Sequence, residues 1–354
     1  MKKFWLKQTD LSRTLDRLAG AIFLCGLILL IWFGAGYFSV LGNDGQNSDV
    51  VSTAEASDEP LPCPYRRLMD GVCVSSIDFT NPRLVAVMVE NSRDAWPLSG
   101  LSQASIVYEA PVEGDIPRFL AIYQSDTDSE EVGPVRSARP YYLDWAEEYG
   151  NPVYMHVGGS DAALDSIHNR DILDINEMSR GWYFWRSSNR SAPHNTYTSH
   201  DLWQNAIDSY GQNYSAAEFA AWNFLENEPC TNDCISEVSV GFSNVPSYQV
   251  TWQYSTSTDQ FERYQGGQRY AADTVIIQRV HAVTLDAVGR KRIDTIGSGG
   301  TVVFRNGQAT QGTWQKTSPS DRTAWLDTLG NPIALQPGKI WIEIVPQSGY
   351  VSWE

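Results

Sequence analysis

The stretch "ASIVYEAPVEGDIPRFLAIYQS", Ala104–Ser125, holds two runs rich in β-branched and aromatic residues, separated by a turn at Gly114. Apolar, β-branched runs bounded by turn residues are typical of β-strands. A similar run, "RLVAVMVENS", precedes them at Arg83–Ser92, and "PVYMHVGGS" follows at residues 152–160. We therefore expect these four segments to form strands.

Helical patterns are interleaved with these strands. "YYLDWAEEYG" (Tyr141–Gly150) follows Pro140, which suits the first position of a helix, and Ser160 is placed to cap a helix over "SDAALDSIH". "SHDLWQNAIDSYG" (residues 199–211) and "SAAEFAAWNFLE" (residues 215–226) also have helical spacing. Helices between strands predict a mixed α/β lobe over residues 62–225.

The second half has a different pattern. From Ile235 onward the sequence consists of short strand-like runs and turns, and Asn306-Gly307 between two such runs is a strong hairpin signal. "PGKIWIEIVP" near the end reads as an alternating strand. We predict a β-rich lobe over residues 226–354 and an α+β fold for the whole.

The N-terminus predicts a membrane anchor. Residues 18–43 contain no charged side chain and are long and apolar enough to span a bilayer as one helix. The five basic residues before it, against none until Arg66 after it, predict a cytoplasmic N-terminus over residues 1–17 and an external C-terminal part. Residues 44–61 read as a flexible acidic linker. A cleaved signal peptide is the alternative, but no small-residue cleavage site is evident.

Charge and cysteine content agree with an external location. The formal net charge of -16 argues against nucleic acid as a partner, because nucleic-acid binders present basic surfaces. Apart from Cys25, the cysteines form two close pairs, Cys63 with Cys73 and Cys230 with Cys234, which read as local disulfides of an oxidising compartment. Other pairings and a zinc site remain alternatives.

Several separated motifs resemble one known family. They are "VAVMVENSRDAWPLSGLSQASIVYEAPVEGDIPRFLAIYQ", "VGPVRSARPYYLDWAEEYG", "HVGGS", "APHNTYTS" and "GSGGTVVFRNGQATQGTWQK". In this order they resemble the YerB-like family, bacterial extracytoplasmic proteins of unknown function with an N-terminal and a C-terminal part. The resemblance implies a bacterial envelope protein with a mixed α/β fold and no established reaction. Members similar to the type protein look like lipoproteins, whereas this chain has an apparent transmembrane anchor.

Arg136 and Arg139 lie together in "VGPVRSARPY", residues 132–141, just before a predicted helix. Helix N-termini attract anions, and the guanidinium fork suits carboxylate or phosphate. Two interpretations stay open. The arginines either pair with Glu109, Glu113 or Asp144 and hold the loop, or they receive an anionic ligand.

Two histidines add chemical possibilities. His156 ends a predicted strand before Gly158, Gly159 and Ser160, and His194 lies in a turn beside Asn195. Glycine turns after strands often hold ligands, and a histidine near Ser160, Asp161 or Glu109 could support acid–base or nucleophilic chemistry. However, no complete catalytic motif is present, and we predict neither a metal site nor a cofactor. A histidine bonded only to the backbone is the structural alternative.

The sequence leaves two hypotheses for function. The first is a membrane-anchored binding or scaffold module for a cell-envelope glycan, peptide or protein, with its ligand residues among Arg136, Arg139, His156, Ser160, His194, Asn195, Glu109 and Glu113. The second is a hydrolase or transferase acting on wall polymer through a His/carboxylate cleft. The aromatic stretch "RGWYFWRSSNR", residues 180–190, could place an exposed ring against a sugar or bury its rings in the core.

Overall fold

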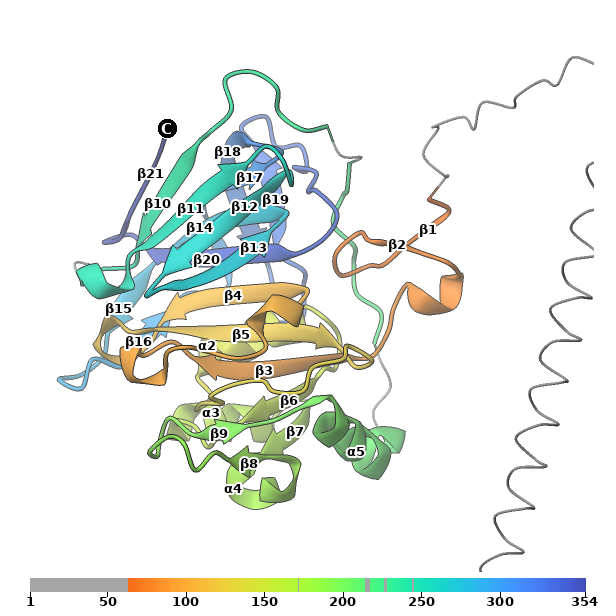
Figure 1. Cartoon of the computed structure of the whole chain (residues 1–354), viewed down its shortest axis with the longest axis vertical. Coiled ribbons are helices and arrows are strands. Elements are labelled where there is room, and N and C mark those ends of the chain that lie inside the picture. The colour runs from red at the N-terminus through yellow and green to blue at the C-terminus, as the bar shows by residue number, and fades with distance from the viewer. Residues whose placement is uncertain (1–62, 171, 214–216, 226–227, 244) are drawn as a thin grey trace, which may run out of the picture. The chain divides into compact units, whose positions relative to one another are not determined.

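The computed structural model describes residues 63–170, 172–213, 217–225, 228–243 and 245–354, all within the unit Pro62–Glu354 (Figure 1). The predicted cytoplasmic segment, membrane anchor and linker lie outside these residues. Within the part described, no helix is long and apolar enough to cross a membrane. The anchor over residues 18–43 therefore stays a prediction.

The largest sheet among the described residues has ten strands. Its spatial order is β19 (Ala324–Asp327), β18 (Gln308–Lys316), β17 (Gly297–Arg305), β14 (Thr274–Val280), β20 (Ile340–Pro346), β4 (Ile106–Pro111), β5 (Pro117–Gln124), β3 (Leu84–Glu90), β6 (Val153–His156) and β7 (Leu173–Asn176). β3, β6 and β7 run parallel to one another, and β20 runs parallel to both β14 and β4. The other neighbours are antiparallel.

A second, antiparallel sheet belongs to the C-terminal half. Its order is β13 (Gln268–Ala272), β12 (Gln260–Gln265), β11 (Val250–Ser255), β10 (Glu237–Gly241) and β21 (Tyr350–Trp353). Three small pairs decorate the unit: β1 (Tyr65–Arg66) with β2 (Cys73–Val74), β8 (Trp185–Arg186) with β9 (Thr196–Tyr197), and β15 (Ala282–Thr284) with β16 (Lys291–Ile293).

The described helices are short. They are α2 (Pro140–Glu147), α3 (Asp161–His168), α4 (Glu177–Arg180) and α5 (His200–Tyr210), with 3-10 turns η1 (Ile77–Phe79), η2 (Arg93–Ala95), η3 (Leu101–Gln103), η4 (Glu113–Asp115), η5 (Gly181–Tyr183), η6 (Gly211–Asn213) and η7 (Pro246–Tyr248). α2 begins at Pro140, and the Ser160 hydroxyl accepts the Ala163 N–H at 3.3 Å, as expected of an N-cap. Both helix starts agree with the sequence prediction.

Two hydrophobic cores lie on opposite faces of the large sheet. Because successive strand residues point to opposite faces, a central strand contributes to both cores. On one face the large sheet packs against the five-stranded sheet, through buried residues that include Phe119, Ile277, Trp341, Trp252 and Phe261. On the other face it packs against α2 and α3, through residues that include Met88, Leu120, Tyr142, Trp145 and Ile167. The α+β fold class agrees with this arrangement.

The strand predictions are confirmed. The four N-terminal runs form β3, β4, β5 and β6, and Asn306-Gly307 connects β17 and β18 as a hairpin. "PGKIWIEIVP" forms β20, but every residue of Ile340–Pro346 is buried rather than alternating. The reason is its position between β14 and β4, with a core on each side.

The helix predicted over residues 215–226 is wrong for its described part. Residues 217–225 are not helical, and Phe224 forms a parallel bridge with Leu335. The Leu225 N–H donates to the Leu335 carbonyl at 3.0 Å, and the Leu335 N–H donates to the Asn223 carbonyl at 2.8 Å. The Trp222 indole N–H donates to the Thr323 carbonyl at 2.7 Å. These tertiary hydrogen bonds replace the intrahelical ones, so helical spacing was overridden by packing.

The large sheet joins the two halves of the sequence. β4 of the first half pairs directly with β20 of the second, from Ile106 opposite Ile340 to Glu109 opposite Glu343. Figure 1 shows the first-half strands β3 to β5 stacked below β20 in one continuous layer. The boundary at residues 225/226 stays a prediction about domains, but the backbone hydrogen bonding of the sheet crosses it.

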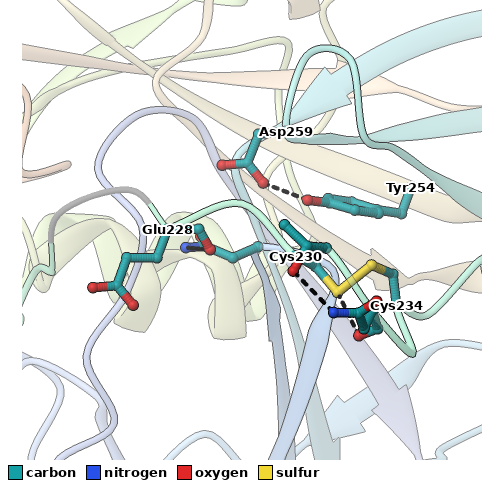
Figure 2. Close-up of a disulfide and its surroundings, with 8 residues drawn as sticks. Glu228, Cys230, Cys234, Tyr254 and Asp259 are labelled. Carbon is teal, nitrogen blue, oxygen red and sulfur yellow. Dashed lines mark hydrogen bonds between the residues drawn. A yellow bond between two sulfur atoms is a disulfide. The ribbon is translucent and has the colours of Figure 1, made fainter.

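Both predicted disulfides are present. Cys63 is bonded to Cys73, and Cys230 to Cys234. Figure 2 shows the second disulfide near the start of the C-terminal half, where the Tyr254 hydroxyl donates to the Asp259 carboxylate at 2.5 Å. The Ile235 N–H donates to the Gly307 carbonyl at 2.8 Å, so the disulfide loop is attached to the β17–β18 turn.

Candidate functional site

The carboxyl ends of β3, β6 and β7 meet at one edge of the large sheet, because these strands are parallel neighbours. They end at Glu90, His156 and Asn176. In sheets of this type, ligands bind outside the carboxyl ends of the strands, and helices that begin there point their N-termini at the ligand. We call this region the strand-end edge.

Residues 132–141, which contain Arg136 and Arg139, lie at this edge between β3 and β6. The Arg136 N–H donates to the Met88 carbonyl at 2.9 Å, and the Arg136 carbonyl accepts the Val157 N–H at 3.1 Å. Further along, the Ala138 N–H donates to the Gly158 carbonyl at 3.0 Å. The segment is therefore held by backbone hydrogen bonds, which fix where its side chains point.

Glu90 is the centre of a small polar cluster. It is 3% exposed, and its carboxylate accepts the Ser92 hydroxyl at 2.9 Å. The Nδ1 atom of His194 lies 2.9 Å from Glu90 Oε2, and the Nε atom of Arg136 lies 3.2 Å from Glu90 Oε1. The structure thus brings together Arg136 and His194, which are far apart in the sequence, around a carboxylate that sequence reasoning did not select.

The geometry of this cluster does not form a serine–histidine–carboxylate triad. Both Glu90 Oε2 and Ser92 Oγ lie nearest the same ring nitrogen of His194, Nδ1, the latter at 3.4 Å. A triad needs the nucleophile and the carboxylate on different ring nitrogens. His194 and Glu90 form a dyad instead, and Nε2 of His194 has no hydrogen-bond partner among the described residues.

Arg139 is fully occupied by protein groups. Its Nε and Nη2 atoms donate to the two oxygens of Glu113 at 2.6 and 2.7 Å, and Nη1 donates to the Ala138 carbonyl at 2.6 Å. Burial opposes the charge of Arg139, but the hydrogen bonds and charge of Glu113 outweigh it and raise the Arg139 pKa. Burial likewise opposes the Glu113 charge, and Arg139 outweighs it, so the Glu113 pKa is lowered. This arginine is a clamp of the kind the sequence allowed.

Arg118 is a third guanidinium at the same edge. It is the second residue of β5, directly opposite Glu90, is 6% exposed, and donates from Nη1 to the Ser137 carbonyl at 2.7 Å. Burial lowers the Arg118 pKa, and the positive charges of Arg139 and Arg136 lower it further. A buried guanidinium that is also repelled by two neighbours is an electrostatic arrangement that an anion would relieve.

Several guanidinium nitrogens at this edge have no protein acceptor. Among the described residues, Nη1 and Nη2 of Arg136 and Nε and Nη2 of Arg118 have no hydrogen-bond partner, and the buried Nε of Arg136 approaches Glu90 without forming a hydrogen bond. The Arg136 side chain is 24% exposed, so its free nitrogens are accessible. These two arginines, and not Arg139, are the anion-binding candidates.

The other predicted residues have structural partners. His156 is completely buried, with Nε2 2.6 Å from Asp174 Oδ1 and Nδ1 2.6 Å from the Gly158 carbonyl. Ser160 caps α3, and Asn195 accepts a hydrogen bond from Arg186 at 3.2 Å. These contacts hold the turns of the edge in place.

Glu109 lies away from this edge, inside the core between the two sheets. It is completely buried and accepts hydrogen bonds from Arg263 Nη2 at 2.7 Å to each oxygen. Neighbouring Glu343 is also completely buried, and burial followed by the negative charge of Glu109 raises its pKa well above the usual range. Asp144, the remaining predicted partner of the arginine pair, is bonded to Arg170 instead.

A cavity of about 680 Å³ opens near the opposite edge, where β6 and β7 begin. Its walls include Glu147, Arg170 and Phe219. The Arg170 guanidinium donates to Ser166, Glu147 and Asp144, so each of its nitrogens already has an acceptor. This cavity therefore does not offer the free guanidinium nitrogens of the strand-end edge.

The aromatic stretch is divided between core and surface. Tyr183 and Phe184 are buried, and Trp185 stacks on Tyr197 with ring centres 5.7 Å apart. Trp182 is 62% exposed. The centre of its ring lies 5.7 Å from the centre of the Tyr183 ring, in the 3-10 turn η5. One accessible aromatic ring therefore remains, as the sequence allowed.

Sequence reasoning missed Glu90, Ser92 and Arg118. A signal was present, because "VENS" places polar residues directly after a buried strand and Arg118 precedes the apolar run of another. Polar residues at strand ends often belong to sites. Their convergence depends on strand order, which the sequence did not reveal.

Comparison with known proteins identifies the family. A sheet shared by two halves of the chain, with a polar edge on the first half, describes a two-part protein. Family models match both parts: the N-terminal domain of "Protein of unknown function (DUF3048)" over residues 71–213 and its C-terminal domain over residues 238–342. The chain belongs to this family, which confirms the YerB-like resemblance.

A curated relative and a solved structure support this assignment. The relative is "Putative lipoprotein YerB" of Bacillus subtilis (strain 168), 32% identical over 282 residues, which are 75% of this chain and 82% of the relative. The crystal structure of the YerB protein from Bacillus subtilis is similar with a TM-score of 0.70 and 29% identity. That match covers 81% of this chain and 99% of the solved chain.

Proposed function

We propose that this protein is an extracytoplasmic, membrane-attached binding module that holds an anionic group of a cell-envelope component at the strand-end edge. The folded unit would stand outside the cell, attached through the N-terminal apolar segment. Arg136 and Arg118 are the proposed receptor groups, and Glu90 and His194 hold Arg136 in position.

The proposed location is supported by three independent features. Two disulfides are typical of an oxidising compartment. The uncharged stretch over residues 18–43, with basic residues before it, favours a single-pass anchor with the C-terminal unit outside. The name of the Bacillus subtilis relative describes a lipoprotein, which is also a membrane-attached protein.

The observation that carries the binding proposal is the contrast between Arg139 and Arg136. Every guanidinium nitrogen of Arg139 has a protein acceptor, whereas Arg136 contacts Glu90 through Nε and leaves both terminal nitrogens available. Arginine forks of this kind recognise carboxylate and phosphate groups. α2 and α3 also begin at this edge, and their N-terminal partial charges add to the attraction for an anion.

The test is retention of envelope material by the purified unit, residues 62–354. This unit contains both hydrophobic cores, so it is expected to fold without the N-terminal segments. Immobilised wild type should retain a component of the envelope fraction that the double variant Arg136→Ala/His194→Ala does not. Equal retention by the two proteins would reject this edge as the receptor.

The chain offers a matched control for this experiment. Arg292 and His281 both pair with Asp294, at 3.4 and 2.8 Å, in an exposed part of the C-terminal half. The variant Arg292→Ala/His281→Ala removes the same two side-chain types from another arginine–histidine–carboxylate group. It should retain the component as well as wild type does.

The His194–Glu90 dyad favours one alternative function, a hydrolase or transferase acting on wall polymer. A carboxylate on Nδ1 orients the ring and leaves Nε2 to take or give a proton. In that case the retained polymer would be cleaved or modified during incubation, and His194→Gln would abolish turnover while leaving retention intact. Recovery of unchanged polymer from wild type supports binding alone.

A further inference from the structure

We propose that the group recognised at the strand-end edge is a phosphate rather than a carboxylate. This inference rests on the proposed binding function and names its chemical class. It follows from the number of free donors at the edge and from what a single carboxylate needs in the same structure.

Arg139 shows how one carboxylate is satisfied here. Its single guanidinium meets both oxygens of Glu113, at 2.6 and 2.7 Å. A carboxylate has two oxygens, and one guanidinium fork matches them both. A ligand carboxylate would therefore be satisfied by Arg136 alone, and the free nitrogens of Arg118 would stay without an acceptor.

A phosphate group matches the larger donor set. It presents three acceptor oxygens arranged around phosphorus and carries more than one negative charge near neutral pH. Arg136 can bind it through two terminal nitrogens, and Arg118 through Nε and Nη2, from adjacent segments. The two side chains come from adjacent segments, since Arg118 donates to the carbonyl of Ser137, the residue after Arg136, and the charge of Arg136 acts on Arg118.

Burial and charge favour the same ligand. Arg118 is 6% exposed, but its Nε and Nη2 atoms are not fully buried, so an anion that accepts from them would replace limited contact with water by charge-assisted hydrogen bonds. The charged groups of the cluster are Arg118, Arg136 and Arg139 against Glu90 and Glu113, so one positive charge remains even with neutral His194. A site with a net positive charge stands out in a chain of net charge -16.

The test is a comparison of small anions at constant ionic strength and pH. Titration calorimetry of residues 62–354 would measure inorganic phosphate and glycerol 3-phosphate against acetate and malonate, which carry one and two carboxylates. We expect saturable binding of the phosphates at least about tenfold tighter than of either carboxylate. Arg136→Ala should weaken phosphate binding by about tenfold or more, and Arg292→Ala should leave it unchanged.

A second variant covers the chance that changes at the buried Arg118 affect folding. Arg118→Lys keeps the charge but loses the fork, so a folded Arg118→Lys protein should also bind phosphate more weakly. Circular dichroism checks the fold of the Arg118→Lys protein. If Arg118→Lys is unfolded, the test uses Arg136→Ala alone. Vesicles of phosphatidylcholine with and without phosphatidic acid separate a lipid headgroup from a soluble phosphate ester, and binding to either source supports the phosphate class.

The outcomes separate the two levels of the proposal. Carboxylates that bind as tightly as phosphates would overturn the phosphate assignment and leave the anion-receptor function standing. If no anion binds and the Arg136→Ala/His194→Ala variant retains envelope material as wild type does, both the phosphate assignment and the anion-receptor function are wrong. Phosphate binding that Arg136→Ala does not weaken would place the site elsewhere and overturn this inference.

Discussion

Arg136 and Arg139 are three residues apart, yet they have different roles. Arg136 approaches Glu90 through Nε at 3.2 Å, whereas Arg139 donates to both oxygens of Glu113. The two interpretations that the sequence left open, a clamp for nearby carboxylates and a receptor for an anion, therefore apply to different residues. Arg139 is a clamp, and Arg136 remains available for a ligand.

The Arg139–Glu113 pair should stabilise the fold measurably. Its hydrogen bonds are bidentate and partly buried, so Arg139→Ala should lower the free energy of unfolding by about 2 kcal/mol. Urea denaturation of Arg139→Ala, of a variant that replaces Glu113, and of the variant with both changes gives the coupling energy between the two side chains. Arg136→Ala, which loses a single ion pair, should cost less. A coupling energy near zero would contradict the clamp.

The same pair predicts sensitivity to acid. The Glu113 pKa is lowered in the folded state, so its contribution is present above the unfolded pKa and is lost as pH falls through the folded value. The stability difference between wild type and Glu113→Gln should therefore shrink as the pH is lowered below the ordinary range of a glutamate. Urea midpoints at pH 7 and in this acid range measure it, and a constant difference would contradict it.

Lys339 should titrate in the mildly alkaline range. Burial lowers its pKa from 10.5 to about 8, and its ammonium donates to the Leu101 carbonyl at 2.9 Å. Between these values the unfolded chain binds more protons, so the Lys339 contribution to stability rises with pH. Relative to Lys339→Met, wild type should gain up to about 3 kcal/mol from pH 8 to 10.5. Urea denaturation of both proteins at several pH values in this range measures the difference in their free energies of unfolding. A difference that does not change with pH would contradict the lowered pKa of Lys339.

At the scale of elements, local signals succeeded where they matched the tertiary environment. Asn306-Gly307 forms the predicted hairpin because both residues adopt the positive φ angles of its turn, +48° and +64°. Residues 215–226 carry equally clear helical spacing, but their described part pairs with Leu335 instead. Helical spacing predicts an amphipathic face and cannot reveal a competing edge elsewhere in the fold.

The hairpin turn offers a controlled test. Gly307→Ala would strain a positive φ and bring its Cβ 2.5 Å from the Tyr254 ring, so it should cost about 3 kcal/mol of stability. Gly330→Ala also strains a positive φ, +86°, but no atom lies within 4 Å of its Cβ. It should cost about 1 kcal/mol. Equal losses in urea denaturation would show that the Tyr254 contact does not matter.

At the scale of the whole molecule, the two halves share a sheet and a buried ion cluster. Arg263 of β12 reaches from the five-stranded sheet to Glu109 of β4 in the large one. It also lies over the Trp341 ring, with the guanidinium carbon 5.0 Å from the ring centre. The first and second halves of the sequence therefore depend on one another for packing.

Removing Arg263 should destabilise both halves together. Arg263→Ala would leave Glu109 buried and unpaired beside Glu343, at a cost of about 3 to 5 kcal/mol. Arg269→Ala, at a 63% exposed arginine on the neighbouring strand, should have a much smaller effect, because exposed ion pairs are screened by solvent. Thermal unfolding followed by calorimetry should show one transition for each protein. Two separated transitions would mean that the halves unfold independently.

The sequence by itself determined the local elements, the disulfide pairs and the family. These depend on residues close in the chain, or on motifs that stay recognisable wherever they lie in space. Most strands, the starts of α2 and α3, and the Asn306-Gly307 turn belong to this class. That Arg136 and His194 belong to a binding site stays a prediction.

Only the tertiary structure decided which charges meet. Glu90 and Arg118 lie near Arg136 and His194 because β3 lies between β5 and β6. Glu109 does not belong to this group, because its side chain is buried in the core between the two sheets. The Coulomb and hydrogen-bond interactions that pair Arg139 with Glu113 and leave the terminal nitrogens of Arg136 free act over a few ångströms. Strand order sets those distances, and strand order depends on contacts between residues far apart in the chain.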